Sequence, residues 1–425
     1  MERNRYLRGL ITALIFVGAL YRYWPYDFPL GPCGIGYESL EIACSLARKA
    51  SFSDPFAILP TGASAHLAPV FPWVVSLLIR WFGDGPAAMN AVQWMGTFVL
   101  ALQLSLWPWA SEQLGMGFLA GVIGAGAWLI AGFALLPMWE AVYVALPILI
   151  LVMCMHRVLS EQVSNVFASL TGILWGFIFL FSPVPLLSYL ALTLWIAFFK
   201  RIRRIQTLAL IVIPFVVITP WMVRNYEVFH HLVPIRDNFG IELWSANNPC
   251  ATFSFDKNRS TDCYNHPNES VSEAKIVRAS GEYAYNQLKL RETLKWIGNN
   301  PGQFANLTRE RFLAFWFYVP GVSYFSGQSV PVSILIIWLA APLSIGGLWL
   351  LFKTDRNAAG LILVWLVLFP PAYYFLAFTT RYRYPILWAS FMPAAFFLIR
   401  VTQGIWHALR NSDPVPLIAD NPQES

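Results

Sequence analysis

The sequence predicts an all-α protein that crosses a membrane many times. Hydrophobic residues make up 57% of the 425 positions and charged residues only 12%, roughly half the charged share of a soluble globular protein. The hydrophobic residues gather in long runs, and basic residues stand in short clusters beside them, as is typical of membrane orientation signals. The formal net charge of +6 therefore gives little support to nucleic-acid binding.

Eleven apolar segments are candidates for membrane helices, and several are shorter than the roughly 20 residues of a straight crossing. They are 9–20, 67–82, 87–109, 116–136, 141–155, 166–181, 186–199, 207–221, 330–352, 358–378 and 386–399. The first follows an arginine-rich start and leads into aromatic residues at 21–24, without the small-residue cleavage site of a signal peptide. We expect it to be a retained helix that ends in an aromatic belt.

The number of crossings follows from where the basic clusters must lie. If all eleven segments cross and the N-terminus is inside, the basic residues at 200–204, Arg157 and the turn at 353–356 all fall outside, against the positive-inside rule. If one early segment fails to cross, these clusters return to the cytoplasm. The same topology places the C-terminal tail, with Arg410, in the cytoplasm.

The segment 67–82 is the best candidate for the one that does not cross. It is short, it has Pro69 and Pro72 near its start, and it contains Arg80. We therefore predict ten transmembrane helices plus one partly embedded helix.

This topology leaves two long polar segments on the non-cytoplasmic face. The predicted parts are an N-terminal transmembrane module (1–221) that includes a first outer loop (25–66), an outer domain (222–329), C-terminal transmembrane helices (330–400) and a cytoplasmic tail (401–425). Within the outer domain, Asn300 and Pro301 indicate a helix start, with Asn as cap and Pro at the first position. Before them, residues 283, 290, 294 and 297 are spaced as on an amphipathic helix, so we expect a small, mainly helical domain.

The five cysteines divide between the membrane and the outer loops. Cys154 lies in a membrane segment and is expected to be an inert apolar side chain. Cys250 and Cys263 flank a short polar stretch, and Cys33 and Cys44 flank the start of the first outer loop, so each pair could close a disulfide in an oxidising compartment. No CxxC or HxxxH spacing indicates zinc.

Carboxylates of the first outer loop are the candidates for a general base. Glu38 and Glu41 lie close to the membrane surface, where loss of hydration disfavours the charged form and raises a carboxyl pKa unless a cation or metal compensates. Such a group suits the removal of a proton from a hydroxyl acceptor. The alternative is that both are solvated charges on a surface helix.

Arginines at the outer ends of helices form a second group of candidates. Arg224, Arg381 and Arg383 can fork onto phosphate oxygens, and a lipid phosphate is the natural ligand at this interface. The alternative is that they pair with lipid headgroups or with Asp237, Glu227 or Glu242. Glu140, near the outer end of another helix, is expected to support a reacting group rather than to react.

Several stretches, taken in order, resemble one known family. They are Gly36-Tyr37-Glu38 continuing through 42–47, the runs 52–56 and 60–72, the segment 220–226 continuing through 237–240 to 247–249, Gly281-Glu282 with Tyr285, and 381–385. Together they resemble bacterial membrane glycosyltransferases of the GT-C fold, in the branch called glycosyltransferase family 39 or dolichyl-phosphate-mannose-protein mannosyltransferase-like. The resemblance spans nearly the whole chain.

The resemblance implies transfer of a sugar from a polyprenyl-phosphate carrier to a lipid, glycan or protein acceptor, on the outer face of the bacterial cytoplasmic membrane. Members of the fold place an Asp in the first outer loop, where this sequence has Ile35 and Gly36. Glu38 then becomes the implied catalytic base, with Glu41 as the fallback. The reaction would invert the sugar.

The resemblance also implies roles for the remaining candidates. Arg381, Arg383 and Arg224 would stabilise the departing lipid phosphate, and His66 would hydrogen-bond the substrate. The alternative is that His66 is an interfacial histidine without such a role. No motif demands a metal, and a divalent cation stays open.

Two other classes of function compete with transfer. A transporter or lipid flippase is disfavoured because the ionisable residues within apolar segments, such as Arg80, Glu140 and His156, lie near helix ends rather than at mid-membrane. A non-catalytic scaffold of the same fold remains an alternative, because the loop lacks the expected Asp.

Overall fold

The computed structural model describes residues 2–25, 27–133, 135–199, 202–317, 319 and 331–410. They form helices joined by loops, with two isolated bridges, Ser53 with Ala63 and Ser254 with Phe378. The basic residues Lys200 and Arg201 and most of the stretch from 318 to 330 lie outside the described residues. The expected all-α class is confirmed for the described chain.

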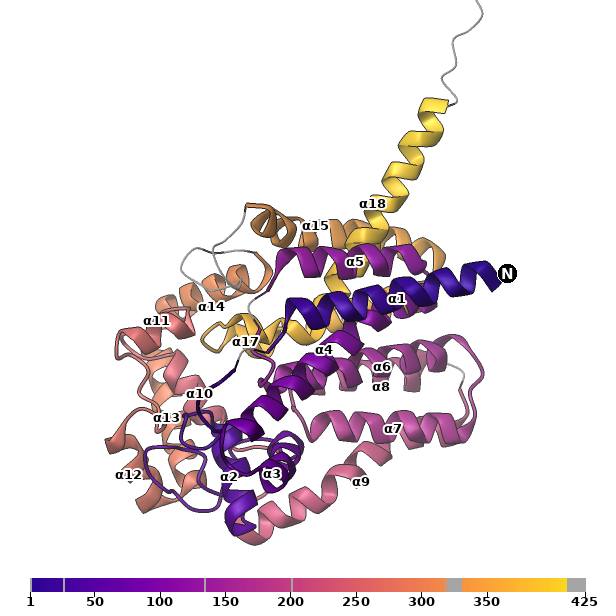
Figure 1. The fold of residues 1–425 in the computed structure, drawn as a ribbon. Helices are drawn as coiled ribbons and strands as arrows, with labels where there is room; N and C mark the ends of the chain where they lie inside the picture. Colours follow the sequence, from indigo (N-terminus) through magenta and orange to yellow (C-terminus); the bar gives the residue numbers. More distant parts are fainter. Residues whose placement is uncertain are drawn as a thin grey trace, which may run out of the picture.

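Apolar helices of different lengths form the larger part of the molecule and lie roughly side by side (Figure 1). They are α1 (Glu2–Arg22), α4 (Pro86–Gln113), α5 (Phe118–Ala131), α6 (Glu140–Ser160), α7 (Asn165–Phe179), α8 (Leu186–Phe199), α9 (Arg204–Phe229), α15 (Pro331–Thr354), α16 (Arg356–Leu368) and α18 (Leu387–Arg410). Short helices α17 (Pro371–Tyr374), η1 (Thr380–Tyr382) and η2 (Tyr384–Ile386) join α16 to α18.

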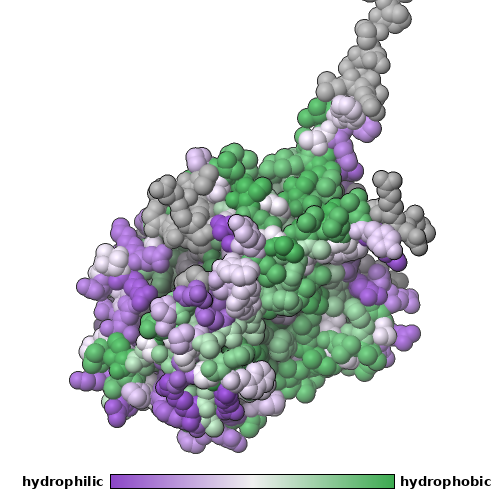
Figure 2. Space-filling model, in the orientation of Figure 1, coloured by the Kyte–Doolittle hydropathy of each residue, from purple (hydrophilic) through white to green (hydrophobic). Residues whose placement is uncertain are grey.

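Five stretches of the described residues are long and apolar enough to cross a membrane: 140–160, 204–229, 331–354, 356–374 and 380–407. Shorter apolar helices, among them α5, α7 and α8, accompany them. The surface over the bundle is largely hydrophobic, whereas hydrophilic residues gather over the region of α11 to α13 (Figure 2). The chain is therefore a multi-pass membrane protein.

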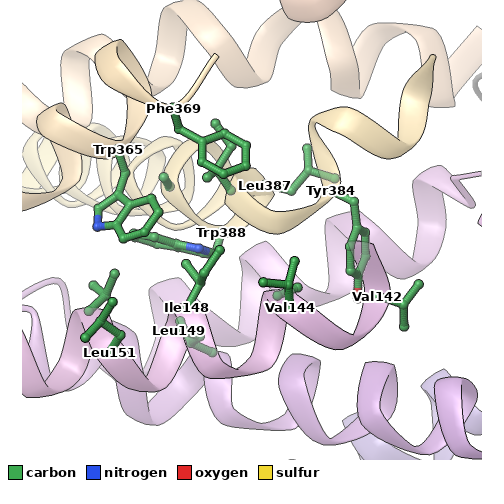
Figure 3. Close-up of a cluster of buried hydrophobic side chains, with 14 of the residues drawn as sticks. Val142, Val144, Ile148, Leu149, Leu151, Trp365, Phe369, Tyr384, Leu387 and Trp388 are labelled. Carbon is green, nitrogen blue, oxygen red and sulfur yellow. The ribbon is translucent and has the colours of Figure 1, made fainter. Parts of the chain in front are cut away.

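Close packing of small and aromatic residues holds the bundle together. A Cβ at Gly347 of α15 would lie 2.0 Å from the carbonyl oxygen of Pro393 in α18, so only glycine allows this helix approach. Val144 and Ile148 of α6 lie toward the segment that carries Tyr384 and Trp388 (Figure 3). This buried cluster fixes the start of α18 against α6.

The first outer loop carries α2 (Glu38–Lys49) and leads into α3 (Val70–Phe82), and these two helices pack against each other near the outer domain (Figure 1). Arg80 of α3 donates from Nη2 to the Leu46 carbonyl of α2 at 2.8 Å, and the backbone N–H of Val70 donates to the Leu180 carbonyl at 3.1 Å. The arginine that made the segment a poor membrane span thus fixes α3 to α2.

The outer domain contains α10 (Phe239–Ala246), α11 (Phe255–Ser260), α12 (Val271–Ser280), α13 (Glu282–Asn299) and α14 (Pro301–Trp316). Helix α14 begins at Pro301 as expected, but the Asn300 side chain makes no cap bond and donates instead to the Trp296 carbonyl at 2.9 Å. The amphipathic helix before it is α13. Its buried face differs from the one expected from residues 283, 290, 294 and 297. Leu294 is 56% exposed, whereas Lys289 and Thr293 are buried, because α13 packs on polar partners.

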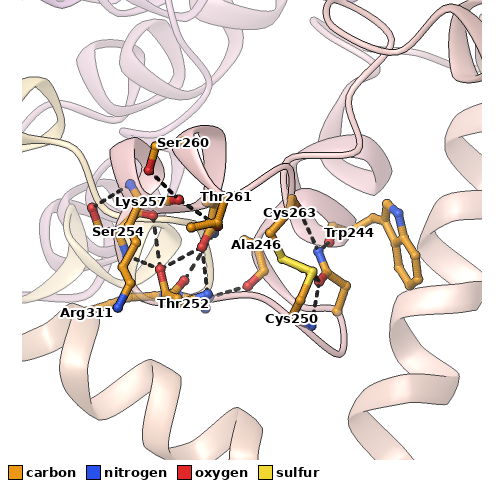
Figure 4. Close-up of a disulfide and its surroundings, with 12 residues drawn as sticks. Trp244, Ala246, Cys250, Thr252, Ser254, Lys257, Ser260, Thr261, Cys263 and Arg311 are labelled. Carbon is orange, nitrogen blue, oxygen red and sulfur yellow. Dashed lines mark hydrogen bonds between the residues drawn. A yellow bond between two sulfur atoms is a disulfide. The ribbon is translucent and has the colours of Figure 1, made fainter.

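Two disulfides lie in the outer segments, Cys33–Cys44 and Cys250–Cys263. The second closes a loop around the amide of Asn248, whose oxygen accepts the N–H of Cys250 at 3.1 Å (Figure 4). Cys154 is the one free cysteine of the described chain. Both pairs considered in the sequence are thus joined in the structure.

Candidate functional site

A cavity opens where α2, the start of α6, α10 and the segment before α18 meet. One end is charged, with Glu38, Glu140, Arg236, Glu242 and Arg381 in its lining. The other end is apolar and runs along α6, the segment between α7 and α8, and the segment after α16. Its lining includes Val144, Ile148, Phe181, Val184, Phe369 and Leu376. We call this space the membrane-side cavity.

Glu38 lies at the charged end because it is the first residue of α2. Its N-cap, Tyr37, has an extended backbone and provides no side-chain cap, and the carboxylate of Glu38 accepts the backbone N–H of Glu38 itself. Burial among protein groups nevertheless raises the pKa of Glu38 to about 7, and nearby Glu242 adds to this rise while Arg381 opposes it. A carboxyl with such a pKa can accept a proton near neutral pH.

Two arginines face this carboxylate across the charged end. Arg236 donates from Nε to the side-chain oxygen of Asn238 at 2.7 Å and lies 3.7 Å from Glu140, the first residue of α6. Arg381 lies on η1, with its guanidinium 5.6 Å from the centre of the Trp139 ring. The charged end therefore offers cationic groups for an anion beside a base for a proton.

Glu38 also belongs to a cluster with two buried histidines. One ligand atom of each of Glu38, His66 and His266 lies within 4.8 Å of the other two. Nδ1 of His266 is 3.9 Å from the Glu38 carboxylate, and Nδ1 of His66 is buried without a hydrogen-bond partner. Burial lowers the pKa of His266 to about 3 and that of His66 well below its usual range, so both imidazoles are neutral.

The cluster fits a divalent cation by its donor set. Neutral imidazole and carboxylate are the ligands that zinc and similar metals prefer, and an unpaired buried ring nitrogen is a group in need of a partner. The sequence did not reveal the cluster, because His266 is 200 positions from His66 in a loop without a metal-binding spacing.

Four of the residues proposed from the sequence line the membrane-side cavity: Glu38, His66, Glu140 and Arg381. The other three are bonded to the backbone elsewhere. Glu41 accepts the N–H groups of Gly34 and Gly36 at 2.8 and 3.1 Å, and so closes the loop that precedes α2.

The two remaining arginines also hold backbone carbonyls. Arg224 donates to the carbonyls of Ser64 and Phe52 at 2.6 and 2.9 Å. Arg383 donates to those of Phe315 and Trp316, at the end of α14, at 3.2 and 3.0 Å. Both bring outer segments together around the cavity rather than facing into it.

A buried carboxylate supports the loop that carries His66. Glu282, the first residue of α13, accepts the hydroxyl of Ser64 and the N–H of Ala65, both at 2.6 Å. Burial raises the pKa of Glu282 to about 8, and the neighbouring Asp237 adds to this. The outer domain thus holds the first outer loop directly.

Sequence reasoning missed several residues of the charged end. Arg236, Glu242 and Tyr382 line the cavity beside the proposed residues. Glu242 was expected only as a possible partner of the arginines, and Arg236 gave no signal, since nothing in a loop sequence shows which side chains face a cavity. Tyr382 stands directly between Arg381 and Arg383 and gave no separate signal.

Solved structures share this fold. The archaeal oligosaccharyltransferase AglB from Archaeoglobus fulgidus, in complex with an inhibitory peptide and a dolichol-phosphate, matches with a TM-score of 0.56 and 13% identity over 99% of this chain and 53% of that one. A structure of the same enzyme in complex with Zn and sulfate matches with a TM-score of 0.54 and 13% identity over 94% and 50% of the two chains. The chain spans about half the length of AglB.

A second protein matches less closely. ArnT from Cupriavidus metallidurans, bound to undecaprenyl phosphate, gives a TM-score of 0.38 and 14% identity over 96% of this chain and 80% of that one. The sequence matches no protein-family model and none of the curated proteins. The chain shares its fold with the matched part of AglB, at low sequence identity.

Proposed function

We propose that this protein is a membrane glycosyltransferase that moves a sugar from a polyprenyl-phosphate carrier to a hydroxyl acceptor. The observation that carries the proposal is the membrane-side cavity, which joins a charged end to an apolar channel in one continuous space. A lipid phosphate has the same division, since its headgroup is anionic and its chain is apolar. The shared fold supports this reading, because AglB was solved with a dolichol-phosphate.

The charged groups have different roles in a direct displacement at the anomeric carbon. Glu38 takes the proton of the acceptor hydroxyl as its oxygen attacks the anomeric carbon. Arg381, with Arg236 beside it, stabilises the charge that develops on the departing phosphate. Attack from the face opposite the leaving group inverts the sugar. Glu140 holds Arg236 in place from 3.7 Å.

Glu38, His66 and His266 are the residues that would hold a divalent cation. A bound cation would supply further positive charge for the phosphate. A direct check is calorimetric titration of the purified protein with zinc or manganese. Binding that is lost in His266→Ala supports the site, and equal binding by that variant would remove it.

We also propose the orientation in the membrane. The ten long helices of the bundle cross, and α3 stays at the outer face with α2 and the outer domain, in the bacterial cytoplasmic membrane with both termini inside. The Arg80 contact with α2 supports this arrangement. A cysteine introduced into the turn at 83–86 should react with a reagent that cannot pass the membrane, and labelling only after the cells are opened would contradict the topology.

The transfer itself is tested with purified protein in lipid nanodiscs and a panel of polyprenyl-phosphate-linked sugars. We expect release of polyprenyl phosphate, followed by mass spectrometry, for at least one donor. A protein that consumes none of them and binds none would be a scaffold. Movement of intact donor across the bilayer without bond cleavage would indicate a flippase.

A further inference from the structure

A second cavity lies on the opposite side of Glu38, between the first outer loop and the outer domain. Side chains of the outer domain line it, among them Asp256, Arg259, Tyr264, Asn268 and Glu269. We call it the outer cleft. It shares five lining residues with the membrane-side cavity: Tyr37, Glu38, Trp139, Glu242 and Arg381. The proposed base and the proposed phosphate-binding arginine thus face both spaces.

Contacts between distant segments build the walls of the outer cleft. Asn268 donates to the carbonyl of Gly36 and accepts the N–H of Ala57 at 3.3 Å, so it joins the outer domain to the loop before α2. On the other wall, the N–H of Phe255 donates to the Phe378 carbonyl at 3.1 Å, close to the segment that carries Arg381. Hydrogen bonds between distant segments therefore fix the walls of the cleft.

The lining chemistry differs from that of the membrane-side cavity. The cleft has no run of aliphatic side chains among its lining residues, where hydroxyl, amide and carboxylate groups prevail. Phe255 and Tyr264 meet edge to face, with ring centres 5.0 Å apart, and provide flat apolar surfaces among the polar groups. Aromatic rings beside hydrogen-bonding side chains suit the two kinds of surface of a sugar ring.

The charged residues that only the cleft contributes offer little to an anionic ligand. They are the carboxylates of Asp256 and Glu269 and the guanidinium of Arg259. Arg259 is already paired with Glu269. A phosphate or sulfate on the ligand would therefore meet the carboxylate of Asp256 and no further cation among these three residues.

We propose that the outer cleft is the acceptor site and that it binds a neutral, hydroxyl-rich glycan. This inference rests on the proposed transfer function and specifies its acceptor. A glycan hydroxyl enters from the cleft and forms the new bond from its oxygen to the anomeric carbon of the sugar. The bond from that carbon to the phosphate oxygen breaks, the electron pair leaves with the polyprenyl phosphate, and the hydroxyl proton passes to Glu38.

The test blocks the cleft without changing the residues that it shares with the membrane-side cavity. The full-length protein carries Cys154→Ser, to remove the free thiol, and Asp256→Cys, which is labelled with a bulky maleimide. Asp256 is exposed on the first turn of α11 and lines only the outer cleft of the two cavities. The matched control is labelled Lys257→Cys, at the next exposed position, which does not line the cleft.

Binding is measured first, by saturation-transfer NMR in nanodiscs. The probes are neutral trisaccharides (maltotriose, mannotriose and N,N′,N″-triacetylchitotriose) and, for comparison, a sulfated trisaccharide. We expect at least one neutral probe to bind the control, and the label on Asp256→Cys to weaken that binding about tenfold or more. Equal binding by the blocked variant, preference for the sulfated probe, or no neutral probe bound would overturn the inference.

Release of polyprenyl phosphate is measured in parallel. If the transfer takes place as proposed, the label on Asp256→Cys abolishes transfer to the bound glycan but spares binding of polyprenyl phosphate. A protein that binds neutral trisaccharides in the cleft but never releases polyprenyl phosphate would support the glycan site and contradict the transferase proposal. Efficient transfer to a lipid or peptide acceptor by the blocked variant would contradict the glycan site alone.

Discussion

Charged side chains gather in two regions of the outer half of the molecule, and they have different partners. The cavity rim contains Glu38, Glu140, Arg236, Glu242 and Arg381, whose side chains line the membrane-side cavity. The braces are Glu41, Arg224, Glu282, Arg311 and Arg383, which do not line that cavity and whose charged groups bind backbone groups. Residues of the same type, only a few positions apart, thus face a cavity in one region and hold the backbone in the other.

Arg311 shows how far the bracing extends. It is fully buried, yet its partners are uncharged: the side-chain oxygen of Asn247 at 2.9 Å, the carbonyl of Phe375 at 3.2 Å and the carbonyl of Ala246. These bonds join α14 and α10 to the segment that leads to Arg381. The rim can hold a fixed geometry because the braces tie each of its segments to another.

Substitutions of Glu38, in the cavity rim, and of Glu41, among the braces, should differ most in their effects on transfer and stability. Glu38→Gln removes the proposed base, so transfer should fall by about 10²–10⁴-fold, while the melting temperature stays near that of the unmodified protein. Glu41→Gln weakens the contacts with Gly34 and Gly36 and should instead lower stability by about 1 kcal/mol. Turnover and thermal unfolding of both purified variants check this. Undiminished transfer by Glu38→Gln would remove Glu38 from the mechanism.

The pair Arg381 and Arg383 should divide in the same way. Arg381→Ala removes a cation from the rim, and transfer should fall by about 10²–10³-fold. Arg383→Ala leaves the carbonyls of Phe315 and Trp316 without their donors and should cost about 1–3 kcal/mol of stability. The melting temperature distinguishes the two variants, because it should fall in Arg383→Ala and stay unchanged in Arg381→Ala. Equal loss of melting temperature in both variants would mean that Arg381 is a brace as well.

Glu282 should change stability rather than transfer, through the pH dependence of stability. Its pKa is about 8 in the folded protein, against an ordinary 4.5, so the folded state keeps a proton that the unfolded state releases between these values. Stability should therefore fall as the pH rises from about 4.5 to about 8. Asp237, with a pKa raised to about 7 by burial, acts in the same direction.

Glu282→Gln mimics the protonated acid, so its melting temperature should fall less steeply across the same pH range. The control for removing an acidic charge is Glu310→Gln on the neighbouring helix α14. If the melting temperature of Glu282→Gln falls with pH as steeply as that of the unmodified protein, then Glu282 is ionised in the folded protein. It would then not hold the first outer loop as a neutral acid.

The sequence predicted the helical class because long hydrophobic runs follow directly from the lipid environment. It named Glu38 as the candidate base with Glu41 as the fallback, and it gave Arg381 and Arg383 the same role. The different contacts of these residues depend on which backbone groups lie within reach after folding. Glu41 lies within reach of the loop before α2, and Arg383 within reach of the end of α14.

The histidine cluster was beyond sequence reasoning for a related reason. His266 comes from a loop of the outer domain and reaches Glu38 only because that domain docks on the first outer loop. The same docking forms the outer cleft. Periodicity and spacing describe single segments, whereas both features arise from contacts between segments far apart in the chain.

The most direct test is an electron cryomicroscopy structure of the protein in nanodiscs with polyprenyl phosphate. We expect the phosphate beside Arg381, within reach of Arg236, and the prenyl chain along Val144 and Ile148 in the membrane-side cavity. A lipid phosphate bound elsewhere, with Arg381 and the apolar channel empty, would contradict the assignment of this cavity to the donor.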